Sequence, residues 1–109
     1  MVESAETVPV CVEIKDLVPP APPARLLGDV GATFVELSWL PSPSADTAFY
    51  RLYRTTGTEP RALVVQTEGL LLRVRDNNMT RGPRTYEVVA VDKGENESAP
   101  GPVLRIVVP

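Results

Sequence analysis

The segment from Arg84 to Asp92, Arg-Thr-Tyr-Glu-Val-Val-Ala-Val-Asp, constrains the fold of this chain more than any other. Side chains of a β-strand point alternately to two faces, with a period of two residues. This alternation places Tyr86, Val88 and Ala90 together on one face. The residues that follow, 93–98, supply the Gly and Asn that tight turns favour. We therefore expect a strand here, with one face buried in a core and a polar turn after it.

A second segment with the same alternation lies upstream. Residues 35–39, Val-Glu-Leu-Ser-Trp, place Val35, Leu37 and Trp39 on one face of a strand. A buried Trp on an early strand and a Tyr at the start of a late strand are typical of a β-sandwich. Trp39 and Tyr86 are therefore the predicted structural signature of this chain.

Each signature residue has a physical role in such a fold. The indole of Trp39 buries one of the largest apolar areas that a side chain offers. The ring of Tyr86 also joins the core, but its hydroxyl needs a hydrogen-bond partner there, which is usually backbone just upstream.

Turn signals recur about every 8–12 residues, and no window has helical periodicity, so the pattern predicts an antiparallel sandwich of short strands. The predicted strands are residues 25–29, 34–40, 49–54, 61–67, 70–75, 84–92 and 103–108. The predicted core consists of Val35, Leu37, Trp39, Tyr50, Leu52, Tyr86, Val88 and Ala90.

Composition limits the class of protein and of partner. A chain of 109 residues with 43% hydrophobic residues is one domain that can bury a core without metal or disulfide. The net charge is -3 and the 11 Lys and Arg residues are scattered, which argues against nucleic acid or an anionic membrane as a partner. No apolar run approaches the roughly 20 residues of a membrane helix, so we expect no membrane insertion by this segment.

The first 18 residues are interpreted as a tail strand and linker of a preceding module. Glu3-Ser4-Ala5 followed by Pro9-Val10 echoes Glu97-Ser98-Ala99 followed by Pro102-Val103, as tandem modules would at each junction. The predicted domains are thus 1–18, the tail, and 19–109, the module.

Residues 7–15 alternate well enough to form a strand of that tail. Val8, Val10, Val12 and Ile14 fall on one face. Such a strand, cut from its own sheet, is expected to be disordered or to add to a sheet edge of its own domain or of a second copy. Addition to a second copy would give a strand-mediated dimer through residues 8–14. Cys11 is the single cysteine and is expected to be a partly buried strand thiol.

Residues 18–23, Val-Pro-Pro-Ala-Pro-Pro, favour extended polyproline geometry. They are interpreted as a semi-rigid linker or as the irregular start of an edge strand. A ligand of SH3 domains is the third alternative, but the segment lacks the usual flanking basic residue.

Candidate chemistry is sparse, because the chain has no His. Asp76 and Asp92 are the best acidic candidates, but each occupies a turn position, where Asp commonly caps backbone amides. Residues 92–97 are rich in oxygen ligands but lack the one-three-five spacing of a calcium loop, so a solvated loop is favoured over a calcium site. Asn78 and Asn96 fit the glycosylation acceptor pattern, which matters only in a eukaryotic secretory pathway. No catalytic, cofactor-binding or metal residue is predicted.

Residues 19–109 resemble a fibronectin type III domain. The resemblance rests on the Pro-rich opening and on residues 35–39, 50–54, 86–92 and 94–100, in that order and spacing. It implies an all-β fold, a seven-stranded antiparallel immunoglobulin-like β-sandwich.

Two details of the resemblance concern loops. The run Ala-Val-Asp-x-Gly-x-Asn-x-Ser at residues 90–98 is similar to modules of bacterial exported proteins and lipoproteins, with Glu95 as one extra residue. The loop before Tyr86 departs from the family, because Met79 lies seven residues ahead where a Leu usually lies six ahead. We expect this departure to affect the local hydrogen bonds where the loop leads into the Tyr86 strand, and to leave the fold unchanged.

The resemblance implies a non-catalytic spacer or protein-interaction module, excised from a larger exported multidomain protein. Its expected partners are neighbouring domains of the same polypeptide or another protein, and its expected place is extracellular, periplasmic or on the cell surface. Residues 1–6 are acidic where a signal peptide is basic, so we expect no signal peptide in this segment.

The alternative is a carbohydrate-binding accessory module of an extracellular polysaccharide-degrading enzyme. Sugar binding normally needs exposed aromatic rings as flat platforms. Only Phe34, Phe49 and Tyr53 have the parity to face outward, which favours the spacer.

Overall fold

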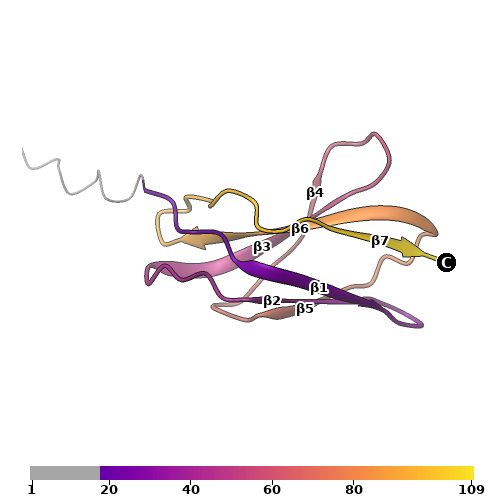
Figure 1. Ribbon diagram of the computed structural model, residues 1–109, viewed down its shortest axis with the longest axis horizontal. Coiled ribbons are helices and arrows are strands. Elements are labelled where there is room, and N and C mark those ends of the chain that lie inside the picture. The colour runs from indigo at the N-terminus through magenta and orange to yellow at the C-terminus, as the bar shows by residue number, and fades with distance from the viewer. Residues whose placement is uncertain (1–17) are drawn as a thin grey trace, which may run out of the picture.

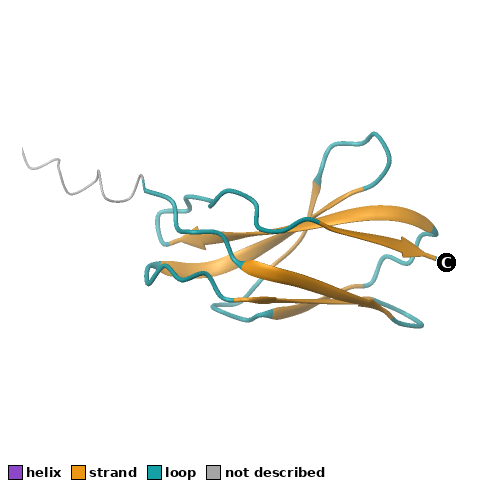
Figure 2. Ribbon diagram, in the orientation of Figure 1, coloured by secondary structure: helices purple, strands orange, loops and turns teal. Residues whose placement is uncertain are grey.

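Two antiparallel sheets stacked face to face make up the described part of the chain, residues 18–109 of the computed structural model (Figures 1 and 2). The strands are β1 (Ala24–Val30), β2 (Val35–Leu40), β3 (Thr47–Thr55), β4 (Ala62–Gln66), β5 (Arg73–Asp76), β6 (Gly82–Asp92) and β7 (Leu104–Val108). One sheet has the order β1-β2-β5 and the other has the order β4-β3-β6-β7. The predicted all-β, seven-stranded sandwich is confirmed.

No helix occurs among residues 18–109, and therefore none there is long and apolar enough to cross a membrane. The predicted strand at residues 7–15, the thiol of Cys11 and the strand-mediated dimer fall outside the described residues. The division at residue 18 stays a prediction.

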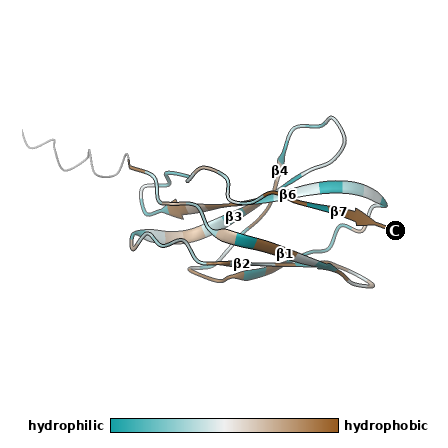
Figure 3. Cartoon of the chain, viewed as in Figure 1, coloured by the Kyte–Doolittle hydropathy of each residue, from teal (hydrophilic) through white to brown (hydrophobic). Residues whose placement is uncertain are grey.

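The core lies between the two sheets, and the alternation of side chains accounts for it. All eight predicted core residues are buried in one cluster, so the predicted inward faces are confirmed. Leu26 of β1 and Ile106 and Val108 of β7 complete this cluster from the edges of the sheets. Figure 3 shows a hydrophilic and a hydrophobic band next to each other on β1. Of its two adjacent leucines, Leu26 is buried and Leu27 is 61% exposed.

Trp39 packs against Tyr50 at the centre of the core. The two ring centroids lie 5.6 Å apart with an interplanar angle of 66°, an edge-to-face arrangement that aromatic pairs favour. Because Trp39 belongs to β2 and Tyr50 to β3, this pair joins the two sheets.

The predicted strand at residues 70–75 is wrong in its first half, because β5 begins only at Arg73. Leu70 and Leu71 are 57% and 55% exposed in the turn that precedes it. The chain turns at Thr67, whose hydroxyl donates to the carbonyl of Gly69 at 2.7 Å. Gly69 adopts a φ of +63°, which a strand does not accommodate. The apolar run resembles a strand in sequence, but only its last residue, Leu72, bonds to a neighbouring strand, through its carbonyl and the amide of Trp39 at 3.0 Å.

The outward residues in the second half of β6 are also buried, which strand alternation does not predict. Val89 and Val91 are only 1% and 0% exposed. After the turn the chain folds back along β6, where the amide of Ser98 donates to Ala90 at 2.8 Å and that of Gly101 donates to Val88 at 3.1 Å. This returning segment gives β6 an extra neighbour that strand alternation alone does not reveal.

The proline-rich segment packs against the loop after β2, so the interpretation as a semi-rigid linker does not describe it. Pro20 and Pro23 are buried. The amide of Ala21 donates to Ser44 Oγ at 2.8 Å, and Ser42 Oγ donates to the carbonyl of Ala21 at 2.6 Å. The alternative interpretation, an irregular start of an edge strand, describes the segment better, since β1 begins at residue 24 directly after it.

Replacing Gly101 with alanine is expected to lower the free energy of unfolding by about 2 kcal/mol, because it overpacks a tight site. The added Cβ would lie 2.6 Å from the backbone carbonyl oxygen of Pro23, which no side-chain rotation can move away. Urea denaturation measures the change.

Gly28→Ala is the matched control for this change. Its Cβ would meet the ends of the Ile106 and Leu104 side chains at 2.7 and 2.9 Å, and these ends can rotate. An equal loss in both variants would contradict the close approach of Gly101 to the proline-rich segment.

Candidate functional site

Tyr86 lies fully buried at one end of the core, and its hydroxyl has side-chain partners. It donates to Asp76 Oδ2 at 2.6 Å and accepts from Arg84 Nη1 at 3.1 Å. The expectation that the Tyr86 hydroxyl bonds to backbone just upstream is therefore wrong. That backbone is bound by Arg84 instead, which donates from Nη1 to the carbonyl of Asn78 and from Nη2 to that of Thr80, both at 2.6 Å.

Arg84 is the residue that the sequence prediction missed. It is only 2% exposed, although arginine is rarely buried without partners. The available signal was parity, because Arg84 lies two residues before Tyr86 and hence on the inward face of β6. Its Nε has no hydrogen-bond partner within residues 18–109.

Asp76 is the anion at the centre of a group of side chains, here called the corner, that consists of Asp76, Arg54, Arg84 and Tyr86. Its Oδ2 accepts from Arg54 Nη1 at 2.5 Å and lies 3.5 Å from Arg84 Nη1, and its Oδ1 accepts from the amide of Asn78 at 3.0 Å. Burial alone would raise the pKa of Asp76, but the hydrogen bonds from Tyr86, Arg54 and Asn78 outweigh it and hold the pKa below its usual value. Burial, followed by the Asp76 carboxylate, raises the pKa of Tyr86 to about 12.

Asp92 is a turn cap, as its position in the sequence indicates. Its Oδ1 accepts from the amides of Gly94 and Asn96, each at 2.9 Å. These hydrogen bonds, with that of the Asn96 amide as the largest effect, lower the pKa of Asp92. In the part of the chain that the structure describes, no three His, Cys, Asp or Glu residues gather closely enough to hold a metal ion.

Glu95, the extra residue of this turn, adopts a φ of +63°, which is unfavourable for any residue with a Cβ. Replacing it with glycine is expected to raise the free energy of unfolding by about 0.5–1 kcal/mol, because glycine adopts this φ without strain. A rise in the thermal midpoint measures the gain.

Glu95→Ala is the control, since it removes the same carboxylate but keeps the Cβ. It also removes the ion pair of Glu95 with Arg51, which spans 3.6 Å at an exposed position and contributes little. A lower midpoint for Glu95→Gly than for Glu95→Ala would contradict the predicted strain.

The three aromatic rings predicted to face outward do so, and each is half-buried. An arginine guanidinium covers every one of them. The distance from guanidinium carbon to ring centroid is 5.3 Å for Arg51 on Phe49, 3.8 Å for Arg61 on Tyr53, and 4.2 Å for Arg75 on Phe34. Such cation–π contacts occupy the flat face that a sugar ring would stack on.

A cluster of charged side chains, here called the sheet-face cluster, covers the outside of the four-stranded sheet. Its members are Arg51, Tyr53, Arg61, Glu87 and Glu97. Glu97 is at its centre: it accepts from Arg51 Nη1 at 2.9 Å and from the Tyr53 hydroxyl, and it lies 3.5 Å from Arg61 Nη2. These groups therefore pair mainly with one another.

The sheet-face cluster is not tuned for acid–base chemistry. Burial would raise the pKa of Glu97, but the bonds from Tyr53 and Arg51 outweigh it and keep the pKa below its usual value. Burial, followed by Glu97, raises the pKa of Tyr53 above its usual value. A general acid or base works best with a pKa near the working pH, and both shifts lead away from neutral pH.

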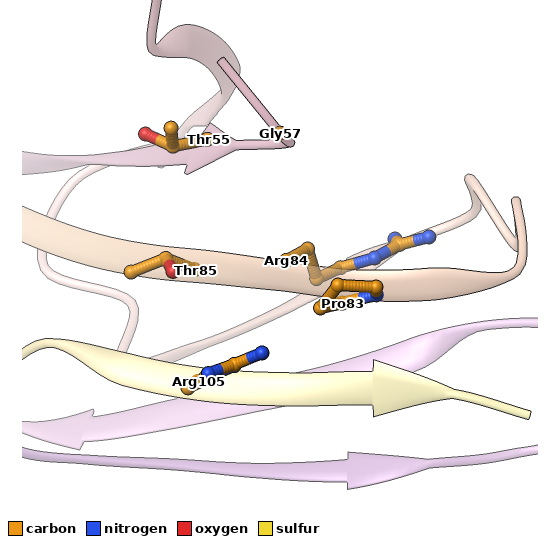
Figure 4. A pocket seen from close by; sticks show the side chains of 6 residues that line it. All are labelled: Thr55, Gly57, Pro83, Arg84, Thr85 and Arg105. Atoms are coloured by element: carbon orange, nitrogen blue, oxygen red, sulfur yellow. The ribbon is translucent and has the colours of Figure 1, made fainter. Parts of the chain in front are cut away.

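Shallow hollows lie beside these groups. One, of about 250 Å³, is lined by Thr55, Gly57, Pro83, Arg84, Thr85 and Arg105, where Thr85 and Arg105 lie on the neighbouring strands β6 and β7 (Figure 4). A second, also of about 250 Å³, lies beside the corner and is lined by Arg54, Thr56, Glu59, Asn78, Thr80, Arg81, Pro83 and Arg84.

Known structures share this architecture. A Fn3-like protein from Clostridium thermocellum superposes with a TM-score of 0.67 and 21% sequence identity, covering 84% of this chain and 96% of that one. The fibronectin type III domain of human fibronectin type III domain containing protein 3 gives a TM-score of 0.63 at 24% identity, covering 84% and 87%. The fold is that of a fibronectin type III domain.

The same fibronectin type III fold matches part of a much longer protein. A β-1,2-glucanase from Parabacteroides distasonis gives a TM-score of 0.69 at 22% identity, covering 84% of this chain but only 13% of the glucanase. No protein-family model matches the sequence, and no curated protein does. The likeness therefore concerns the fold alone.

Proposed function

We propose that this fibronectin type III module is a non-catalytic spacer or protein-interaction unit of a larger exported multidomain protein. The observation that carries the proposal is the pairing of each outward aromatic ring with an arginine. Together with the internally paired sheet-face cluster, this pairing leaves a surface suited to lie beside other protein domains. The resemblance in sequence to modules of bacterial exported proteins and lipoproteins supports a place outside the cytoplasm.

Carbohydrate binding is the second candidate, and the likeness to part of a β-1,2-glucanase favours it. Affinity electrophoresis in gels containing soluble β-1,2-glucan separates the two. We expect the chain to migrate at the same rate with and without the glucan, because the ring faces of Phe34 and Tyr53 are covered. Retardation that Tyr53→Ala or Phe34→Ala abolishes would favour the carbohydrate-binding module.

A replacement experiment distinguishes a spacer from an interaction unit. In the full-length protein, residues 19–109 are replaced by an unrelated β-sandwich of the same length. A spacer predicts that neighbouring domains keep their activities, since only separation matters. Loss of partner binding, restored by returning the original module, would assign interaction to its surface.

The proposed tail strand has its own test. Deleting residues 1–18 should leave the remainder folded and nearly as stable, because we interpret them as the tail of a preceding module. If residues 8–14 add to a sheet edge of a second copy, light scattering should show a dimer that the deletion removes. Unfolding of the shortened chain would show that these residues belong to the module.

A further inference from the structure

The hollow beside the corner, here called the end hollow, lies where the loops after β3 and after β5 meet. Its volume is about 250 Å³, and seven of its eight lining residues have polar or charged side chains. Arg54, Arg81 and Arg84 contribute guanidinium groups to it, and Thr56 and Thr80 contribute hydroxyls.

Many hydrogen-bond donors of the end hollow have no acceptor in residues 18–109. Arg54 uses only Nη1, which donates to Asp76, so its Nε and Nη2 are unused. Arg81 is exposed and makes neither a hydrogen bond nor an ion pair with the described residues. The Nε of Arg84 is buried and also unpartnered. Because Arg84 Nε is buried, the donors that a ligand in the hollow can reach are those of Arg54 and the exposed Arg81.

The charges of the end hollow leave it positive. Three guanidinium groups line it, whereas the nearby carboxylates are those of Glu59 in the lining and Asp76 in the corner. Glu59 is exposed and makes no ion pair within the described residues, so its charge offsets one guanidinium, and three guanidinium groups against two carboxylates leave a formal charge of +1. The chain as a whole carries a net charge of -3, which makes a local positive site distinctive.

We propose that the end hollow binds an oxyanion, a carboxylate or phosphate group, between Arg54 and Arg81. The guanidinium fork matches both groups through paired hydrogen bonds, and it is more weakly hydrated than an ammonium. The hydroxyls of Thr56 and Thr80 supply further donors. This site goes beyond the proposed spacer function, since a spacer needs no ligand.

The test is a titration followed by NMR of the arginine Nε–H signals at constant ionic strength, held with chloride. One arm adds inorganic phosphate and the other adds an acetyl-capped, amidated Glu-Glu dipeptide. We expect saturable shifts confined to Arg54, Arg81 and Arg84 in at least one arm. The titration that gives the lower dissociation constant identifies the source of the oxyanion, which is either a free inorganic anion or the carboxylate of a peptide.

Arg81→Gln is the decisive variant, because Arg81 pairs with no described residue and its loss should leave the thermal midpoint unchanged. It is expected to weaken binding about tenfold. Arg105→Gln removes the same charge from the other hollow (Figure 4) and should change the affinity less than about twofold. Absence of saturable shifts in both arms, or equal weakening in the two variants, would overturn the site.

Discussion

Replacing Trp39 with alanine is expected to lower the free energy of unfolding by about 3–5 kcal/mol. The indole is 4% exposed, packs edge-on against Tyr50, and belongs to the cluster that joins both sheets. Its removal leaves a cavity that neither sheet can close without moving strands. A loss of this size is a large share of typical domain stability, about 5–15 kcal/mol.

Urea denaturation followed by far-UV circular dichroism measures this loss, because Trp39 is the single tryptophan and its fluorescence is absent from the variant. Leu63→Ala is the control, since Leu63 is an exposed large apolar residue of β4 and should change stability by less than about 0.5 kcal/mol. A loss below about 1 kcal/mol for Trp39→Ala would show that the sandwich does not depend on this contact.

Asp76→Asn is expected to lower the free energy of unfolding by about 3 kcal/mol at neutral pH. The change removes the charge that compensates Arg84, whose guanidinium is buried, and breaking one partner of a buried ion pair leaves an uncompensated charge. Asp46→Asn removes an exposed carboxylate elsewhere and should have a small effect. Equal effects of the two changes would contradict the role of the corner.

The lowered pKa of Asp76 also predicts how the free energy of unfolding depends on pH. The pKa of Asp76 is lower in the folded chain than its usual value of 3.8, so its contribution to stability is fully present above that value. The contribution disappears as the pH falls below 3.8 and through the lowered pKa, where the folded carboxylate takes up its proton. Acid should therefore destabilise the original chain more steeply than Asp76→Asn. Parallel curves for the two chains between pH 7 and about 2 would refute this linkage.

Alternation predicted the part of the fold that depends on burial of one strand face. Val35, Leu37 and Trp39 all face the core. A register slip of one residue would expose all three, so burial of this face determines the register. Leu70 and Leu71 were misassigned because an apolar run has the same composition whether or not a partner strand lies beside it. Pairing is a property of the assembled sheet.

The contacts of the candidate surfaces were less predictable. Arg61 covers Tyr53 across two segments whose pairing is shifted by an irregularity between Leu52 and Tyr53, and that shift has no signal in the sequence. Arg84 was missed because arginine is normally exposed. Parity was the one signal in the sequence that indicated an inward position. The acceptors of Arg84, the carbonyls of Asn78 and Thr80, belong to a loop whose course the sequence does not predict.

The corner also determines how the two sheets align. Asp76 belongs to the three-stranded sheet, whereas Arg54, Arg84 and Tyr86 belong to the four-stranded one. Apolar contacts are non-directional and tolerate some sliding of one layer over the other, so a core of this kind loses uniqueness before it loses stability. The hydrogen bonds of Asp76 are satisfied in one alignment only, because they are directional and buried. In this module, a polar group at one end therefore selects a single arrangement from the several that the apolar core would accept.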